Sequence, residues 1–246
     1  MSSHTKQSQP ERAFTRLELL IVVVMLALLA GIALPGLAST KQRSEQAICL
    51  GNLRQIGQAF HLWANEHGDR NPWITPVGEG GTQVANGQIG NPQRELPYYQ
   101  WAWISNELIT PKTLVCPSDR VGSPRKMAAN FSFHTNEGFF ASGFKDFSIS
   151  YIIGLHTYSD TPRAILSGDR NIRWDAQNVL CGLGFGLALS LTYPTSSVAW
   201  TNAIHGEMGN LLFEDGSVEQ LSSMGLQRAA GVPNQGDNGA HHFISP

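Results

Sequence analysis

Residues 19–34 read LLIVVVMLALLAGIAL, sixteen residues without a polar side chain. Pro35–Ala38 extend the apolar run to twenty residues, and a helix of that length spans roughly 30 Å, about the thickness of the hydrocarbon core of a bilayer. The leader before the run carries Lys6 and Arg12 against a single Glu11, which favours a cytoplasmic N-terminus. The sequence therefore predicts a transmembrane helix over 14–38, with the rest of the chain on the far side of the membrane.

Two residues in this segment are unusual for a simple anchor. Glu18 stands at the start of the apolar run, although a charged side chain costs about 2.5–3.5 kcal/mol at the centre of a membrane helix and less near the interface. Pro35 lies near the end of the run, where proline is expected to kink or interrupt the helix. A signal peptide has no use for the carboxylate, so Glu18 indicates a second role for this segment.

The stretch AFTRLELL, residues 13–20, resembles the class III signal of type IV prepilins and type II secretion pseudopilins. In that family a membrane peptidase cuts just before a Phe and then methylates the new amine. A Glu is the fifth residue of the mature chain and a Pro is the twenty-second. If Phe14 is the first mature residue here, Glu18 is the fifth and Pro35 is the twenty-second.

Two positions depart from the family pattern. Ala13 stands where the family usually has Gly before the cut, and Arg16 replaces an apolar residue and places a cation near Glu18. The resemblance implies that residues 1–13 are a leader, and that Ala13 and Phe14 flank the site of processing and methylation. It also implies the partners: prepilin peptidase, other pilin or pseudopilin subunits, an inner-membrane assembly platform and membrane lipid.

The chemistry of Glu18 fits a role in assembly. Cleavage before Phe14 would create a cationic amine one helical turn from the carboxylate, and methylation keeps that charge. In a filament the Glu18 of one subunit could pair with the amine of a neighbour, and pairing in a low dielectric gives register as well as attraction. Two alternatives stay open: a plain signal anchor with an accidental Glu, and a conventional secretory signal cut after Ala38.

An amphipathic stretch follows the apolar run over residues 39–68. Its apolar residues recur at spacings of 4, 3, 4 and 3, which is one stripe of an α-helix. The stripe consists of Cys49, Leu53, Ile56, Phe60 and Trp63. We expect one long helix, continuing to His67, whose second half packs on a globular head.

The remainder is expected to be an α+β head over 69–232 and a loose polar tail over 233–246. The strongest strand signal is the pair of β-prone runs at 210–214 and 217–221, separated by Asp215-Gly216, which is typical of a two-residue hairpin turn. Residues 222–230 then predict a short helix. The fold class predicted is α+β and pilin-like, with a long N-terminal helix packed on an antiparallel sheet.

The spacing from His205 to Asp215-Gly216, H-x9-DG, resembles a signature that accompanies prepilin-type N-termini in a large bacterial family. Other matching pieces are CLGNLRQIG at 49–57, CPSD at 116–119, GDRN at 168–171 and His205-Gly206. The resemblance does not establish what the motif does. In one interpretation His205 bonds a loop carbonyl and Asp215 makes the turn; in the other, they belong to a site for a cation or a partner subunit.

Composition and motifs narrow the function classes. The net charge of −2 and pI of about 6.4 argue against a nucleic-acid binder. The eight histidines include no His-Glu-x-x-His, and the chain has no Cys-x-x-Cys and no Gly-x-Ser-x-Gly, so we predict no enzyme and no cofactor. A calcium ion is coordinated by six to eight oxygen atoms. The sequence does not place the carboxylates of Asp169, Asp175 and Asp215 together, so no metal site is predicted.

The three cysteines allow three pairings with one thiol left over. If the head lies outside the inner membrane, disulfides are allowed, and Cys49 with Cys116 is the preferred pair. Cys181 sits in an apolar, glycine-rich stretch. The alternative is that all three are buried small apolar residues.

These observations predict a structural subunit of a type II secretion pseudopilus or a type IV pilus-like filament. It would be a single-pass inner-membrane protein with a periplasmic head. The competing class is a signal-anchored periplasmic binding protein or enzyme with a site near His205, Asp169 and Asp215.

Overall fold

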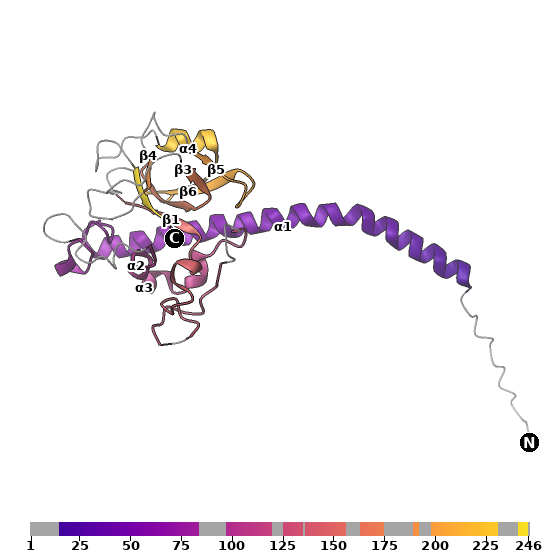
Figure 1. Cartoon of the computed structure of the whole chain (residues 1–246), viewed down its shortest axis with the longest axis horizontal. Helices are drawn as coiled ribbons and strands as arrows, with labels where there is room; N and C mark the ends of the chain where they lie inside the picture. Colours follow the sequence, from indigo (N-terminus) through magenta and orange to yellow (C-terminus); the bar gives the residue numbers. More distant parts are fainter. Residues whose placement is uncertain are drawn as a thin grey trace, which may run out of the picture. The chain divides into compact units, whose positions relative to one another are not determined.

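The computed structural model describes residues 15–83, 97–119, 125–134, 136–155, 163–174, 189–191, 198–230 and 241–245. The chain divides into two compact units, Met1–Arg43 and Ser44–Pro246, and each is described by itself. The first unit contains the beginning of helix α1 (Arg16–Glu66), and the second contains the rest of α1 and the head (Figure 1).

No helix in the described part of the chain is long and apolar enough to cross a membrane. This finding overturns the transmembrane helix predicted over 14–38 and the single-pass inner-membrane location, with its cytoplasmic N-terminus and periplasmic head, that depended on it.

The second half of α1 forms one wall of the core. All five residues of the predicted stripe are buried, with exposed fractions of 4% or less, whereas Arg54, Gln55 and Gln58 between them are exposed. Gly57 lies on the buried side, and a Cβ there would come within 2.9 Å of Leu212 Cδ1, so the helix backbone closely approaches the sheet. The amphipathic stripe predicted from the sequence is therefore confirmed.

The head contains a six-stranded antiparallel sheet in the order β4-β8-β1-β2-β6-β7. Its strands are β1 (Tyr151–Gly154), β2 (Ile165–Asp169), β4 (Leu189–Leu191), β6 (Met208–Phe213), β7 (Val218–Ser222) and β8 (His241–Ile244). A separate two-stranded ribbon pairs β3 (Ile172–Trp174) with β5 (Val198–Trp200). The predicted α+β class with an antiparallel sheet is what the structure shows.

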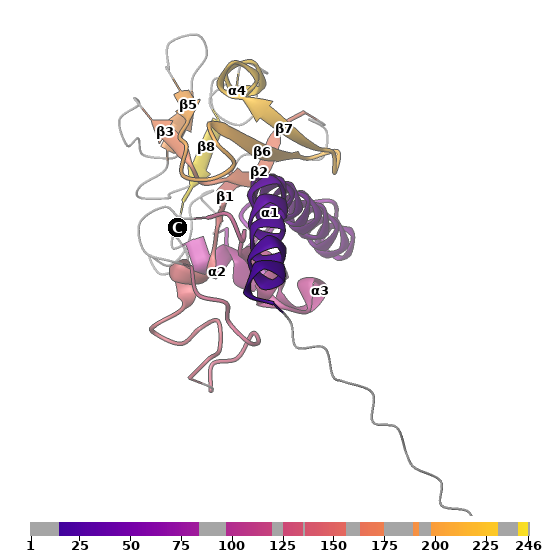
Figure 2. The same ribbon diagram turned by 90° about the vertical axis from the view of Figure 1, so that its right-hand side faces the viewer.

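Both faces of the sheet are covered. Successive strand residues point to opposite faces, and Ile153 and Leu212 join the cluster with α1, while Ile152 and Leu211 join the cluster with helix α4 (Ser223–Ala230). Figure 2 shows α4 on one side of the sheet, and the part of α1 that belongs to this unit packs on the other side. Burial on both faces explains why successive residues of β1, β2 and most of β6 are buried, rather than every second residue.

Short helical segments pack beside this sheet. They are η1 (Val77–Glu79), α2 (Pro97–Ala102), α3 (Ser105–Leu108), η3 (Pro111–Leu114) and η4 (Lys145–Ser148). The aromatic stretch that contains Tyr98 and Trp101 forms α2.

Two local predictions differ from the structure. The β6–β7 hairpin is present, but Phe213 N donates to Ser217 O, so the connection has three residues rather than two, with Gly216 in the left-handed region at φ 79°. Within the tail predicted to be loose, β8 pairs with both β1 and β4, and its Phe243 is 1% exposed. A short strand flanked by polar residues gives little periodic signal, so only its pairing partners reveal it.

Candidate functional site

The first turn of α1 is closed by reciprocal hydrogen bonds between Thr15 and Glu18. Thr15 N donates to Glu18 Oε2 at 2.8 Å, and Glu18 N donates to Thr15 Oγ1 at 3.2 Å. This arrangement is a capping box, which satisfies backbone N–H groups at a helix start. The backbone hydrogen bond from Thr15 also lowers the pKa of Glu18, so the exposed carboxylate is ionised at neutral pH. Glu18 thus has a local structural role that the sequence analysis did not include.

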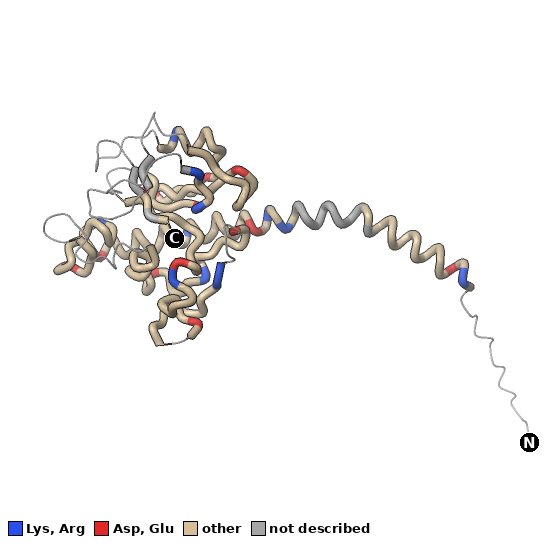
Figure 3. The backbone as a smooth tube through the Cα atoms, in the orientation of Figure 1, with Lys and Arg blue, Asp and Glu red and all other residues tan. Residues whose placement is uncertain are grey.

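Beyond this turn, α1 exposes large apolar side chains on every side. Eleven of them, between Leu17 and Leu29, have exposed fractions from 46% to 68%. They are Leu17, Leu19, Leu20, Ile21, Val22, Val23, Val24, Met25, Leu26, Leu28 and Leu29. Figure 3 shows a described stretch without charge after the first charged residues of α1, which the sequence identifies as Arg16 and Glu18. A helix that is apolar all round is normally buried in a larger structure.

Ala13 and Phe14, predicted as the processing site, lie outside the described residues. Pro35, predicted to kink the helix, lies in a part of α1 whose side chains are outside the described residues, and the helix assignment runs through it.

A second cluster of chemistry lies inside the head, around a disulfide. Cys49 on α1 is joined to Cys116, which follows η3, with a Cα–Cα distance of 5.2 Å. This is the pair preferred from the sequence. The two residues are 67 positions apart and both are fully buried. The disulfide therefore links the long helix α1 covalently to the segment that follows η3.

His205 packs against this disulfide. Its Nε2 lies 3.5 Å from Cys116 Sγ and 3.7 Å from Asp169 Oδ2, and its side chain is 1% exposed. Burial lowers the pKa of His205, so the ring is neutral at pH 7. The residue sits in a turn at φ 49°, ahead of β6. The expected bond to a loop carbonyl is thus replaced by contacts with a sulfur and a carboxylate.

Asp169 ends β2 directly beneath the histidine and is completely buried. Asn210 donates to its Oδ2 through both backbone N and Nδ2, at 2.8 and 2.9 Å. Burial raises the pKa of Asp169 to about 7. Its Oδ1 is buried with no hydrogen-bond partner among the described residues.

A buried ion-pair group completes this part of the head. Arg170 donates to both carboxylate oxygens of Asp119, at 2.7 and 3.1 Å, and Arg125 Nε lies 3.3 Å from Asp119 Oδ2. The Asp119 side chain is 0% exposed and those of the two arginines are 8% and 9% exposed. Burial, followed by the charge of Arg170, lowers the pKa of Arg125. The Asp119 carboxylate is therefore the counter-charge of two arginine side chains that are largely shielded from water.

The H-x9-DG motif does not form one site. His205 precedes β6 and Asp215 follows it, and a six-residue strand spans roughly 20 Å. Asp215 Oδ1 accepts from Ser217 N at 2.8 Å, which stabilises the turn that Gly216 completes. The turn interpretation of Asp215 agrees with this geometry. Asp175, the third carboxylate weighed for a cation site, lies outside the described residues.

The sequence does not reveal that these buried groups converge. The pieces CPSD and GDRN resemble a family signature, but that resemblance gives Asp119 and Arg170 no role. The available signal was charge shortly after apolar residues, since Asp169 lies three positions after Leu166 and Asp119 lies three positions after Cys116. That signal indicates a buried polar group but does not identify its partners.

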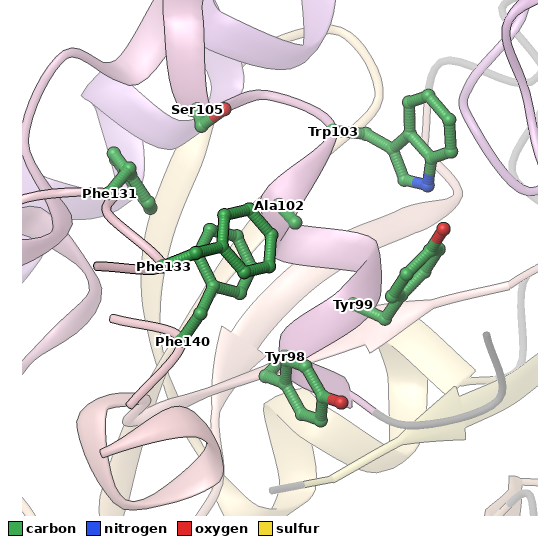
Figure 4. Close-up of a pocket in the computed structure, with 8 residues that line it drawn as sticks. All are labelled: Tyr98, Tyr99, Ala102, Trp103, Ser105, Phe131, Phe133 and Phe140. Atoms are coloured by element: carbon green, nitrogen blue, oxygen red, sulfur yellow. The ribbon is translucent and has the colours of Figure 1, made fainter. Parts of the chain in front are cut away.

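A hydrophobic pocket opens elsewhere on the head, with a volume of about 370 Å³. Figure 4 shows aromatic rings around it, with Phe133 stacked on Phe140 at a centroid distance of 3.9 Å. The lining comprises Tyr98, Tyr99, Ala102, Trp103, Ser105, Phe131, Phe133 and Phe140. None of these described lining residues is charged, so the pocket offers ring faces and a few hydroxyl groups.

Glu214, next to the hairpin turn, provides a test of buried charge by pH. It is 7% exposed, accepts from Asn71 Nδ2 at 3.2 Å, and burial raises its pKa from 4.5 to about 7. Between those values the folded state binds more protons than the unfolded state, so the free energy of unfolding falls as pH rises and levels off above about 7. In the wild type the free energy of unfolding should fall between about pH 4.5 and 7, and we expect Glu214→Gln to make that fall smaller by roughly 2–3 kcal/mol.

Urea unfolding from about pH 4.5 to 8 measures the effect. Glu219→Gln is the matched control, because Glu219 is 41% exposed and its change should leave the pH profile close to that of the wild type. Parallel profiles for wild type and Glu214→Gln would contradict the prediction.

Comparisons with models of protein families, with characterised proteins and with solved structures find no match to this chain.

Proposed function

We propose that this chain is a structural subunit of a filament of the type IV pilus or type II secretion pseudopilus kind, assembled through the first part of α1. The observation that carries the proposal is the belt of eleven exposed apolar side chains from Leu17 to Leu29. Burying one large aliphatic side chain contributes about 1.5–3 kcal/mol, so the belt provides a strong drive for association.

The distribution of the belt favours a filament over a dimer. A two-stranded coiled coil covers one stripe of each helix, at two positions in every seven. Here nine of the ten residues from Leu17 to Leu26 are charge-free, and residues 19–26 are consecutive exposed apolar positions, so they face all directions. Several neighbouring helices are needed to cover them, as in a bundle of helices at the centre of a filament.

Glu18 would set the register of that bundle. Thr15 N already bonds the Glu18 carboxylate, and the Phe14 nitrogen is only three covalent bonds from Thr15 N. Cleavage before Phe14 by prepilin peptidase would therefore place a cationic amine close to this carboxylate. The same amine could pair with Glu18 of a neighbouring subunit once the helices pack.

The capping box supplies the control for this idea. Glu18→Gln keeps an oxygen that can accept from Thr15 N but removes the charge, whereas Thr15→Val removes the hydroxyl of the cap and keeps the charge. If charge pairing drives assembly, Glu18→Gln should fail to form filaments and Thr15→Val should form them. Loss of a paired charge at a dry interface costs about 3–5 kcal/mol, or more than a hundredfold in association.

The experiment is co-expression with prepilin peptidase, followed by mass spectrometry of the N-terminus and electron microscopy of sheared filaments. The expected result is a chain beginning at N-methylated Phe14, filaments from wild type and Thr15→Val, and none from Glu18→Gln. An uncut N-terminus would overturn the processing step. Normal filaments from Glu18→Gln would show that Glu18 only caps the helix.

A further inference from the structure

Four potential metal ligands meet at the disulfide from four separate parts of the chain. The ligand atoms of Cys49, Cys116 and His205 all lie within 4.8 Å of one another. Asp169 Oδ2 lies 3.7 Å from the same histidine nitrogen that contacts Cys116. Two sulfurs, one imidazole and one carboxylate are the ligand types that Zn²⁺ accepts in a four-coordinate site.

The use of one ring nitrogen separates this cluster from a catalytic Cys–His–Asp arrangement. In such a triad the nucleophile and the carboxylate contact opposite nitrogens of the imidazole. Here both contacts are to His205 Nε2. Because the cysteine sulfur and the Asp169 carboxylate both approach the same nitrogen of His205, the three groups are arranged as ligands around an ion and not as a proton relay.

One distance agrees with a tetrahedral centre, and the two sulfurs, bonded to each other in the disulfide, separate on reduction. Zinc lies about 2.3 Å from sulfur and 2.0–2.1 Å from nitrogen, so a tetrahedral angle separates the two ligand atoms by about 3.5 Å. The distance from Cys116 Sγ to His205 Nε2 is 3.5 Å. Buried polar atoms are almost always satisfied, yet Asp169 Oδ1 has no hydrogen-bond partner among the described residues.

We propose that reduction of the Cys49–Cys116 disulfide converts this cluster into a Zn²⁺ site whose ligands are both sulfurs, His205 Nε2 and the Asp169 carboxylate. With a phosphine reductant, the phosphine takes the oxygen of one water molecule and becomes a phosphine oxide. The S–S bond breaks and the two protons of that water form the two thiols. Zn²⁺ then displaces both thiol protons, so the oxidised protein cannot bind it in this way.

Hydrogen bonds from a neighbouring residue already orient one of these ligands. Asn210 holds the Asp169 carboxylate through two donors, both on Oδ2. Outer contacts of this kind fix ligand orientation and contribute to metal affinity. Oxygen-only ions such as Ca²⁺ are disfavoured because two of the four ligands are sulfur.

The test uses the full chain in a Cys181→Ser background, which removes the third thiol. The protein is reduced with the phosphine, freed of reductant without air, and titrated with Zn²⁺ against a chromogenic chelator. Co²⁺ is the spectroscopic probe, because thiolate ligands give it charge-transfer absorption. We expect one Zn²⁺ per chain in the reduced form, none in the oxidised form, and a hundredfold or greater loss of affinity in His205→Ala.

Matched variants distinguish the site from adventitious binding. His61→Ala changes a histidine outside the cluster and should leave the affinity unchanged, whereas Asp169→Asn should weaken it at least tenfold and alter the Co²⁺ spectrum. Circular dichroism follows the fold throughout. Equal Zn²⁺ binding by oxidised and reduced protein, or by His205→Ala, would overturn the proposal. A reduced chain that is unfolded and that Zn²⁺ does not refold would also overturn it.

Discussion

Replacement of both bridged cysteines, Cys49→Ala with Cys116→Ala, is expected to lower the free energy of unfolding by about 4 kcal/mol. The bridge closes a loop with a sequence separation of 67, and the chain-entropy relation assigns that cost to the freedom the unfolded chain regains. Domains are stable by only about 5–15 kcal/mol, so this loss is a large share of the total.

Thermal unfolding with and without reductant checks this expectation. For a chain of this size, about 4 kcal/mol corresponds to a fall in Tm of roughly 8–16 °C. Reductant should shift the wild type by a similar amount and leave the double variant unchanged. A double variant that unfolds within 2 °C of the wild type would contradict the structural role of the bridge.

Asp119→Ala is expected to be nearly as destabilising, by about 3–5 kcal/mol. The change removes a carboxylate that lies within ion-pair distance of both Arg125 and Arg170, whose side chains are 9% and 8% exposed. Two guanidinium groups would then be left in a poorly solvated region without that counter-charge. Burial is what makes the pair costly to break, because water cannot replace the lost partner.

Denaturant unfolding at neutral pH measures the effect, with Glu219→Ala as the matched control. Glu219 also pairs with an arginine, Arg163, at 2.7 Å, but the side chains are 41% and 45% exposed. Exposed pairs contribute about 0–1 kcal/mol, so the control should stay close to the wild type. Equal effects of Asp119→Ala and Glu219→Ala would show that the buried group is better solvated than its geometry indicates.

The buried stripe of α1 was predictable because the period of a helix is local. Cys49, Leu53 and Ile56 recur at helical spacing, and only one face of a helix can pack on a sheet. The β6–β7 hairpin was predictable for a similar reason, since Asp215-Gly216 between β-prone runs specifies a turn, although not the length of its loop. The prediction of a transmembrane helix was wrong, and prepilin-type cleavage before Phe14 remains a prediction.

The buried cluster was not predictable, because its members are far apart in the sequence. Cys116, Asp169 and His205 come from three segments, and nothing local specifies that β2 pairs with β6 and so brings Asp169 beneath the histidine. The strand β8 shows the same limit, since four residues of the polar C-terminal segment become a central strand only when β1 and β4 are there to pair with them.

The long helix, with its apolar first part and amphipathic second part, could be predicted from the sequence, as could the α+β class of the head. Each of these depends on the spacing of apolar residues, which follows the local geometry of the backbone. The folded chain was needed to establish the strand order, the pairing of Asp119 with two arginines, and the convergence of His205 with Cys116 and Asp169. These depend on long-range contacts and on burial, which set the charge states and partners of side chains that the sequence merely lists by type.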